Sequence, residues 1–122
     1  MKSDDLIFRQ INSSFVQNGR VTSQAFRPTP KDEKKLSAYD GSMISAEKAF
    51  EHYTTTLELN SVGVMGLTQE ECSGNGLPVV PDPEPFPEHV LLDFTPYENG
   101  PITRMSKTLK AIAEARGWLH KV

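Results

Sequence analysis

A dense run of prolines is the feature that most restricts how this chain of 122 residues can fold. Five prolines lie between positions 78 and 87, and from residue 81 to residue 87 every second position is proline. Proline has no backbone N–H and a fixed φ, so we expect this segment to form neither a helix interior nor a strand paired in a ladder. Its formal Pro-x-x-Pro spacing has no flanking basic residue, so we expect a rigid surface connector between strands rather than a ligand for aromatic grooves.

Apolar patterns on both sides of this run predict several short strands and helices. The expected strands are 6–11, 35–39, 62–67 and 89–94, and 21–26 is either a strand or an ordered loop. The expected helices are about 46–57, a short one from Thr68, one after Asn99-Gly100 that ends before Gly117, and a brief turn before Gly19. We therefore predict a single α+β domain over residues 1–122, with a small mixed sheet, two main helices and short extra helices.

Three local signals make these helices more specific. Ala46, Ala49, Phe50, Tyr53 and Leu57 follow helical spacing after the N-cap residue Ser45, and they should pack on the sheet. Thr68 and Glu71 have the spacing of a capping box. The last helix should bury one apolar stripe, which consists of Ile102, Met105, Leu109, Ile112 and Ala113. Trp118 and Leu119, which follow this helix, should fold back on the core.

The charge distribution argues against nucleic acid as the partner. Residues 1–100 hold eight Lys/Arg and fifteen Asp/Glu, whereas residues 101–122 hold five and one. A net-acidic body repels phosphates, and the basic helix face lacks exposed aromatics for base stacking; that face carries Arg104, Lys107, Lys110 and Lys121. Because Cys72 is the single cysteine and neither a signal peptide nor a membrane span is apparent, we expect a cytoplasmic protein without membrane contact.

No residues suggest a metal site, a cofactor or a catalytic set. His89 and Asp93 lie roughly 13 Å apart along a strand, and His52 and Glu51 diverge on a helix. Ser42 and Ser73 stand outside the Gly-x-Ser-x-Gly pattern of serine hydrolases. Acidic Glu70 and Glu71 precede Cys72 and should raise its thiol pKa, which disfavours a nucleophile. We therefore assign no catalytic residue, no cofactor and no metal ligand.

A cluster of donors around a glycine turn is the best candidate for a binding site. Forked guanidinium groups beside hydroxyls and an amide suit recognition of phosphate or carboxylate groups. The candidate ligand-binding residues are Arg9, Arg20, Ser23, Gln24, Arg27 and Tyr39. The alternative is that Arg9 and Arg20 form structural salt bridges with Asp5, Asp40 or Glu47.

Two resemblances bear on these residues. The segments that carry the first resemblance are Ile7-Phe8-Arg9, Asn18 to Phe26, and Leu36-Ser37. In these segments the chain resembles a family of small uncharacterised bacterial and phage-associated proteins with a Gly-Arg-x-(Ser/Thr)-Ser-x-Ala-Phe motif. The resemblance implies no activity. In layout alone, the chain resembles small NAD-consuming ADP-ribosyltransferase-like toxins. The residues in matching order are Arg9, Gly19-Arg20, Ser37-Ala38-Tyr39 and Glu47 or Glu51.

These observations support two hypotheses of function. The first is a non-catalytic protein-binding accessory or immunity-like module of a bacterial or mobile-element operon, since no catalytic set is apparent and the loops offer binding surfaces. The second, from the toxin resemblance, is an NAD-consuming enzyme. There Arg9 and Arg20 would clamp phosphates, Tyr39 would stack on the nicotinamide and Glu51 would be the polarising carboxylate.

Overall fold

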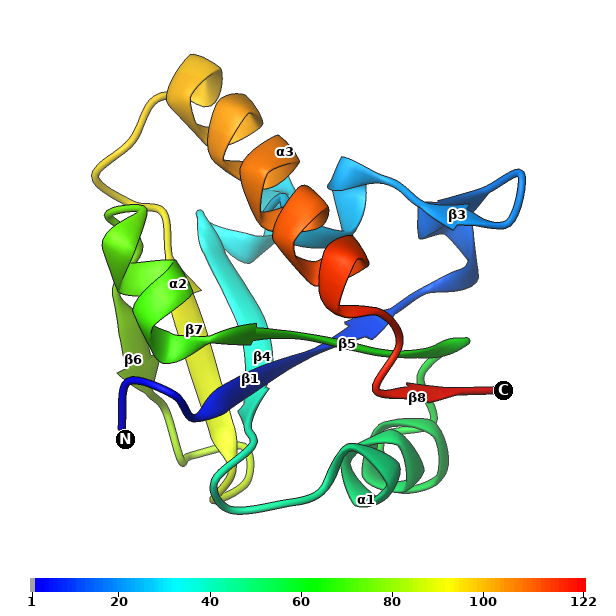
Figure 1. Cartoon of the computed structure of the whole chain (residues 1–122). Helices are drawn as coiled ribbons and strands as arrows, with labels where there is room; N and C mark the ends of the chain where they lie inside the picture. The colour runs from blue at the N-terminus through cyan, green and yellow to red at the C-terminus, as the bar shows by residue number, and fades with distance from the viewer. Residues whose placement is uncertain (1) are drawn as a thin grey trace.

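The computed structural model describes residues 2–122 and is built around a six-stranded sheet (Figure 1). The strand order is β6-β7-β4-β1-β5-β8, and every neighbouring pair among these strands is antiparallel. The strands are β1 (Leu6–Ile11), β4 (Lys35–Asp40), β5 (Gly63–Thr68), β6 (Val79–Pro81), β7 (His89–Asp93) and β8 (His120–Lys121). The α+β class is confirmed. The expected mixed sheet is not found, because no pair of neighbouring strands in the sheet of the described residues is parallel.

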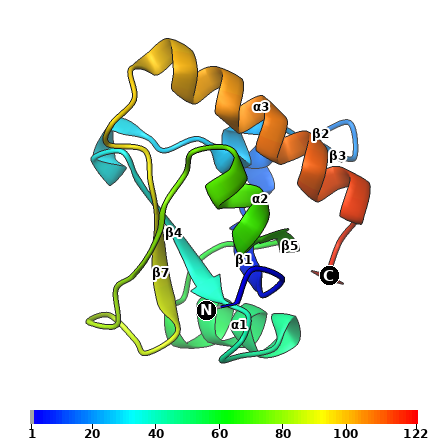
Figure 2. The same ribbon diagram turned by 60° about the vertical axis from the view of Figure 1, so that its left-hand side comes forward.

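Helices cover the sheet on both faces (Figure 2). α3 (Asn99–Arg116), α2 (Gln69–Gly74) and the short turn η2 (Ser23–Phe26) lie on one face. α1 (Ala46–Glu51) lies on the other face and continues into a π-helical turn, η4 (His52–Thr56). The chain therefore has three layers, with the sheet in the middle.

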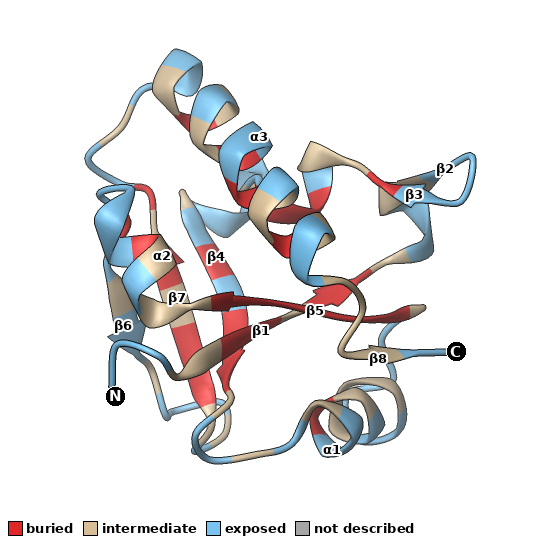
Figure 3. Ribbon diagram, in the orientation of Figure 1, coloured by how far each residue is buried: buried red, intermediate tan, exposed pale blue. Residues whose placement is uncertain are grey.

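The alternation of side chains along each strand divides the core in two. Ile7 belongs to the larger cluster beneath α3, and the next residue, Phe8, belongs to the smaller cluster beneath α1. On β5, Met65 and Val64 divide in the same way. Burial is accordingly concentrated in the central strands (Figure 3). Strands buried on both faces carry nearly continuous apolar sequence, as β5 does.

The expected caps and the α3 stripe are present, but the stripe of the first main helix lacks Leu57, which is 37% exposed. Lys48 donates its backbone N–H to Ser45 Oγ at the start of α1. Thr68 and Glu71 form the reciprocal capping box of α2, with bonds of 2.7 and 3.1 Å. α3 buries Ile102, Leu109 and Ala113 and half-buries Met105 and Ile112. Trp118 packs against the larger cluster and Leu119 against the smaller one, as expected.

Two segments differ from the prediction. Residues 21–26 are neither one strand nor one loop, because β2 (Val16–Gln17) and β3 (Arg20–Val21) form a hairpin that precedes η2. The hairpin turns at Asn18-Gly19, where both residues have positive φ, as the tight two-residue hairpin turn requires. Pro81 pairs within β6, although we expected the proline run to exclude ladder pairing. β6 is an edge strand, where a missing N–H can face outward.

Candidate functional site

A fork between two central strands forms the first part of the candidate site. β1 and β4 pair only through Ile7↔Asp40 and Phe8↔Tyr39, although β1 remains paired with β5 along its whole length. Beyond these pairs the two strands separate, as Figure 1 shows. A hollow of about 530 Å³ lies there, which we call the fork cleft; its lining includes Arg9, Gln10, Arg27, Thr29, Lys31, Asp32, Ser37, Tyr39, Tyr53, Phe86 and His89.

Arg9 fills the apex of the fork. Its Nε donates to the backbone oxygen of Ala25 at 2.7 Å, and its Nη1 donates to the backbone oxygen of Ser37 at 3.1 Å. The guanidinium group also lies over the ring of Phe15, 5.9 Å from its centroid. Burial lowers the pKa of Arg9 from its ordinary value, and Tyr53 and Asp32 oppose that shift. A guanidinium carries five N–H groups, so several remain to bind a ligand oxygen.

Gln10, beside Arg9, has an unused donor. Its Oε1 accepts a hydrogen bond from Ser61 Oγ at 2.8 Å. Within residues 2–122 its Nε2 is the one buried side-chain nitrogen or oxygen without a hydrogen-bond partner. A buried amide N–H group without a hydrogen-bond partner destabilises the folded protein. A ligand oxygen that accepted this hydrogen bond would remove that cost.

An aromatic cluster forms the opposite wall of the fork cleft. The ring of Tyr39 stacks on Phe86 at a centroid distance of 4.9 Å, and its hydroxyl lies 2.8 Å from His52 Nδ1. Burial raises the pKa of Tyr39, and Tyr53 and Glu88 raise it further. Tyr39 is therefore a neutral phenol whose ring face is already covered by Phe86.

The structure also aligns a serine, a histidine and an aspartate in this wall. His89 Nε2 lies 3.1 Å from Ser37 Oγ. On the other side of the ring, Nδ1 lies 2.9 Å from the backbone oxygen of Asp82 and 3.3 Å from its carboxylate Oδ2. The imidazole is only 8% exposed, and Phe86 packs edge-on against it. Ser37 itself is exposed and lines the fork cleft together with His89.

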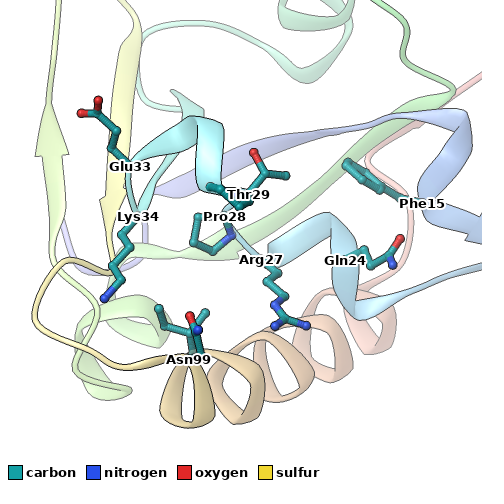
Figure 4. A pocket seen from close by; sticks show the side chains of 10 residues that line it. Phe15, Gln24, Arg27, Pro28, Thr29, Glu33, Lys34 and Asn99 are labelled. Atoms are coloured by element: carbon teal, nitrogen blue, oxygen red, sulfur yellow. The ribbon is translucent and has the colours of Figure 1, made fainter.

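A second hollow adjoins the fork cleft. It has a volume of about 850 Å³ and lies between the segment 24–34 and the start of α3; we call it the α3 groove. Figure 4 shows the side chains of Arg27 and Lys34 directed toward α3, while the Glu33 carboxylate points away from them. Lys34 Nζ donates to the backbone oxygen of Tyr97 at 2.8 Å. Phe15, Arg27 and Thr29 line both hollows, so the two form one continuous surface.

Arg20 and Ser23 lie apart from this surface. They line a third hollow of about 460 Å³ next to α3. Arg20 donates to both carboxylate oxygens of Glu114, at 2.9 and 3.1 Å, and that interaction raises the pKa of Arg20. Arg20 thus forms a structural bridge, although its partner is none of the three carboxylates that we expected.

The six candidate residues are therefore distributed over three hollows. Arg9 and Tyr39 lie in the fork cleft, Arg27 lies at its junction with the α3 groove, and Gln24 lies in that groove. Arg20 and Ser23 line the third hollow. The structure brings Arg9, Arg27 and Tyr39 together and leaves Arg20 separate.

Sequence reasoning did not find the contact between Ser37 and His89. The two residues lie 52 positions apart and meet because β4 pairs with β7, with Tyr39 opposite His89. The signal in the sequence was a histidine that begins an otherwise apolar strand. A buried histidine needs hydrogen-bond partners, but the sequence does not identify them.

Comparison of the chain with protein-family models, curated proteins and solved structures finds no match. Among residues 2–122, no helix is long and apolar enough to cross a membrane. The same residues contain no group of three or more His, Cys, Asp or Glu side chains arranged to hold a metal ion. The geometry of the fork cleft and the α3 groove therefore carries the argument on function.

Proposed function

We propose that this protein is a binding module for a protein partner and that an acidic segment of the partner lies along the fork cleft and the α3 groove. The observation that carries this proposal is the continuity of the two hollows through Phe15, Arg27 and Thr29. A surface that continues over two hollows suits an extended peptide segment better than a compact small molecule. An accessory or immunity-like role in a bacterial or mobile-element operon is the setting that we propose.

The charges along this surface favour an acidic occupant. Arg9 and Lys31 line the fork cleft, Lys34 lines the α3 groove, and Arg27 lines both. No hydrogen bond or ion pair involves the Arg27 side chain within the described part of the chain. A chain with a formal net charge of −3 thus concentrates cations on one surface, which would steer an acidic segment toward it.

The two acids on this surface oppose the cations only weakly. The Asp32 carboxylate accepts hydrogen bonds from the backbone N–H and the hydroxyl of Thr29, at 2.7 and 2.9 Å, and so is engaged within its own turn. Glu33 points away from Arg27 and Lys34 (Figure 4). Carboxylates of a partner would therefore find more donors than acceptors.

The NAD-consuming alternative has less support from this geometry. It needs Arg9 and Arg20 to clamp one pyrophosphate, but they line separate hollows and Arg20 is paired with Glu114. It also needs a ring face of Tyr39 that is open to the nicotinamide, but Tyr39 is buried and stacked on Phe86. We therefore place the binding function first.

Fluorescence anisotropy with a labelled polyglutamate peptide tests this proposal. We expect the peptide to bind at low salt, and Arg27→Glu should weaken binding at least about tenfold, which equals about 1.4 kcal/mol. The matched control is Lys107→Glu, because Lys107 is an exposed cation that lines the third hollow. Equal weakening by the two substitutions, or equal affinity for a polylysine peptide, would refute the proposed surface.

A further inference from the structure

We propose that Ser37 is a nucleophile for acyl transfer, that His89 is its general base, and that the fork cleft receives a small carboxylic ester. The inference rests on the bonds that join Ser37, His89 and Asp82, and it requires no bound acidic segment, although the ester would enter the same fork cleft. Such arrangements are recognised by geometry and role rather than by order in the chain. The order here is serine, aspartate, histidine.

The surroundings of His89 determine which of its nitrogens carries the proton. Nδ1 faces the backbone oxygen and the carboxylate of Asp82, both of which can only accept hydrogen bonds. Nδ1 must therefore be the donor. In the neutral imidazole this leaves the lone pair on Nε2, which faces Ser37 Oγ at 3.1 Å. That tautomer can take a proton from the serine hydroxyl, as a general base must.

The nucleophile is accessible and lies near a cation. Ser37 is exposed and lines the fork cleft, so an ester could reach its hydroxyl. Arg9 Nη1 donates to the backbone oxygen of Ser37 at 3.1 Å, so the guanidinium lies beside the peptide group of the nucleophile. Its remaining N–H groups would stabilise the oxyanion that develops on an ester carbonyl during attack.

The reaction balances with water as the second substrate. Ser37 Oγ bonds to the carbonyl carbon while its proton passes to His89 Nε2. The bond to the alcohol breaks, and the proton leaves on that alcohol. Water then attacks the acyl-serine, loses a proton to Nε2 and releases the carboxylic acid, and Ser37 regains its proton. Asp82 is a positioning residue, because it holds the ring in the tautomer that this sequence requires.

Covalent labelling with a fluorophosphonate tests the nucleophile directly. Serine attack on the phosphorus displaces fluoride, and mass spectrometry locates the adduct. We expect one adduct, on Ser37, that is absent from Ser37→Ala and from heat-denatured protein. His89→Gln should slow labelling by about 10²-fold or more. Melting curves would establish that this variant is folded.

The matched control serine is Ser42. Its hydroxyl is bonded to the Asp40 carboxylate at 2.6 Å, and no histidine bond to it is present among the described residues. Ser42→Ala should therefore leave labelling unchanged. An adduct on Ser42, no adduct on Ser37, or a folded His89→Gln variant that labels at the wild-type rate would each overturn the proposal.

Nitrogen NMR of the histidine rings tests the positioning role of Asp82 without any variant. We expect neutral His89 to carry its proton on Nδ1 in the wild-type protein. A proton on Nε2 would overturn the proposal, because that nitrogen could then no longer accept the serine proton. Both measurements omit the acidic peptide, so their outcome is distinguishable from failure of the proposed binding function.

Discussion

Cys72 shows how burial determines the chemistry of a single residue. The side chain projects from α2 and is fully buried in the larger core. Burial, together with the neighbouring Glu71 carboxylate, raises the pKa of the Cys72 thiol to about 12. The effect of Glu71 has the direction expected from the sequence, although burial is the larger cause.

We predict that Cys72 does not react with a thiol reagent in the folded protein at pH 8. The thiolate is the reactive form, and at this pH almost none is present. Labelling followed by absorbance should proceed only as fast as the chain unfolds, and urea should accelerate it. Rapid labelling of the native protein, at a rate insensitive to urea, would contradict this prediction.

The Glu114 carboxylate gives a pH dependence with a defined sign. Hydrogen bonds from Arg20 and then Lys110 lower its pKa from 4.5 to about 2, and desolvation opposes them. Because the folded pKa is depressed, the stabilisation is present above pH 4.5 and is lost as the pH falls toward 2. Both partners are partly exposed, so the contribution is small and is screened by salt.

We therefore predict that Glu114→Gln lowers the free energy of unfolding at pH 7 but not at pH 2. Urea titrations of the wild-type protein and the variant at both pH values measure this difference. Glu84→Gln is the matched control, because Glu84 is an exposed acid outside any helix or strand. If Glu114→Gln lowers the free energy of unfolding by the same amount at both pH values, the loss does not come from the charge of the Glu114 carboxylate.

At the scale of elements, α1 shows why helical spacing predicts only part of a helix. The apolar spacing assumed a uniform period of 3.6 residues. At its end the helix widens into a π turn, in which Leu57 N–H bonds to the carbonyl of His52, five residues back. Phe50 and Tyr53 still pack against the smaller core, but Leu57 is 37% exposed. The extra residue in the turn rotates Leu57 off the buried face.

The two cores should respond differently to the loss of an aromatic ring. Phe26 at the end of η2 is fully buried in the larger core, and its backbone oxygen accepts a bond from Ser106. Phe26→Ala should cost about 3–5 kcal/mol. Phe50 is half-buried against the ring of His120, so Phe50→Ala should cost less. Urea unfolding of both variants measures the difference, and equal losses would contradict the assignment of the larger core.

At the scale of the whole molecule, the sequence predicts the helices and strands better than it predicts which of them lie side by side. The α+β class, the capping box of α2 and the stripe of α3 follow from local patterns. The fork between β1 and β4 does not, because it depends on where pairing between distant strands stops. The contact of Ser37 with His89 likewise depends on the pairing of β4 with β7, and Arg20 lies apart from Arg9 because it belongs to the β2–β3 hairpin. Neither has a local sequence signature.

The C-terminal segment contacts both cores at the edge of the sheet. Trp118 packs on the α3 side and Leu119 on the α1 side, and β8 pairs with the start of β5. Gly63 makes this pairing possible. A Cβ at that position would lie 2.6 Å from the backbone oxygen of His120 and 2.8 Å from the ring of Trp118. A backbone oxygen in a strand ladder cannot move aside without breaking the pairing.

We predict that Gly63→Ala displaces β8 and lowers stability by about 1–3 kcal/mol, as overpacking does. Hydrogen exchange should accelerate at the backbone N–H groups of Leu119 and Val122, which bond to the carbonyls of Val64 and Val62. Gly74→Ala is the matched control, because a Cβ there would meet no atom within 4 Å, and that variant should melt no lower than the wild type. If Gly63→Ala melts with the control and both amides stay protected, β8 does not depend on the absence of a side chain at Gly63.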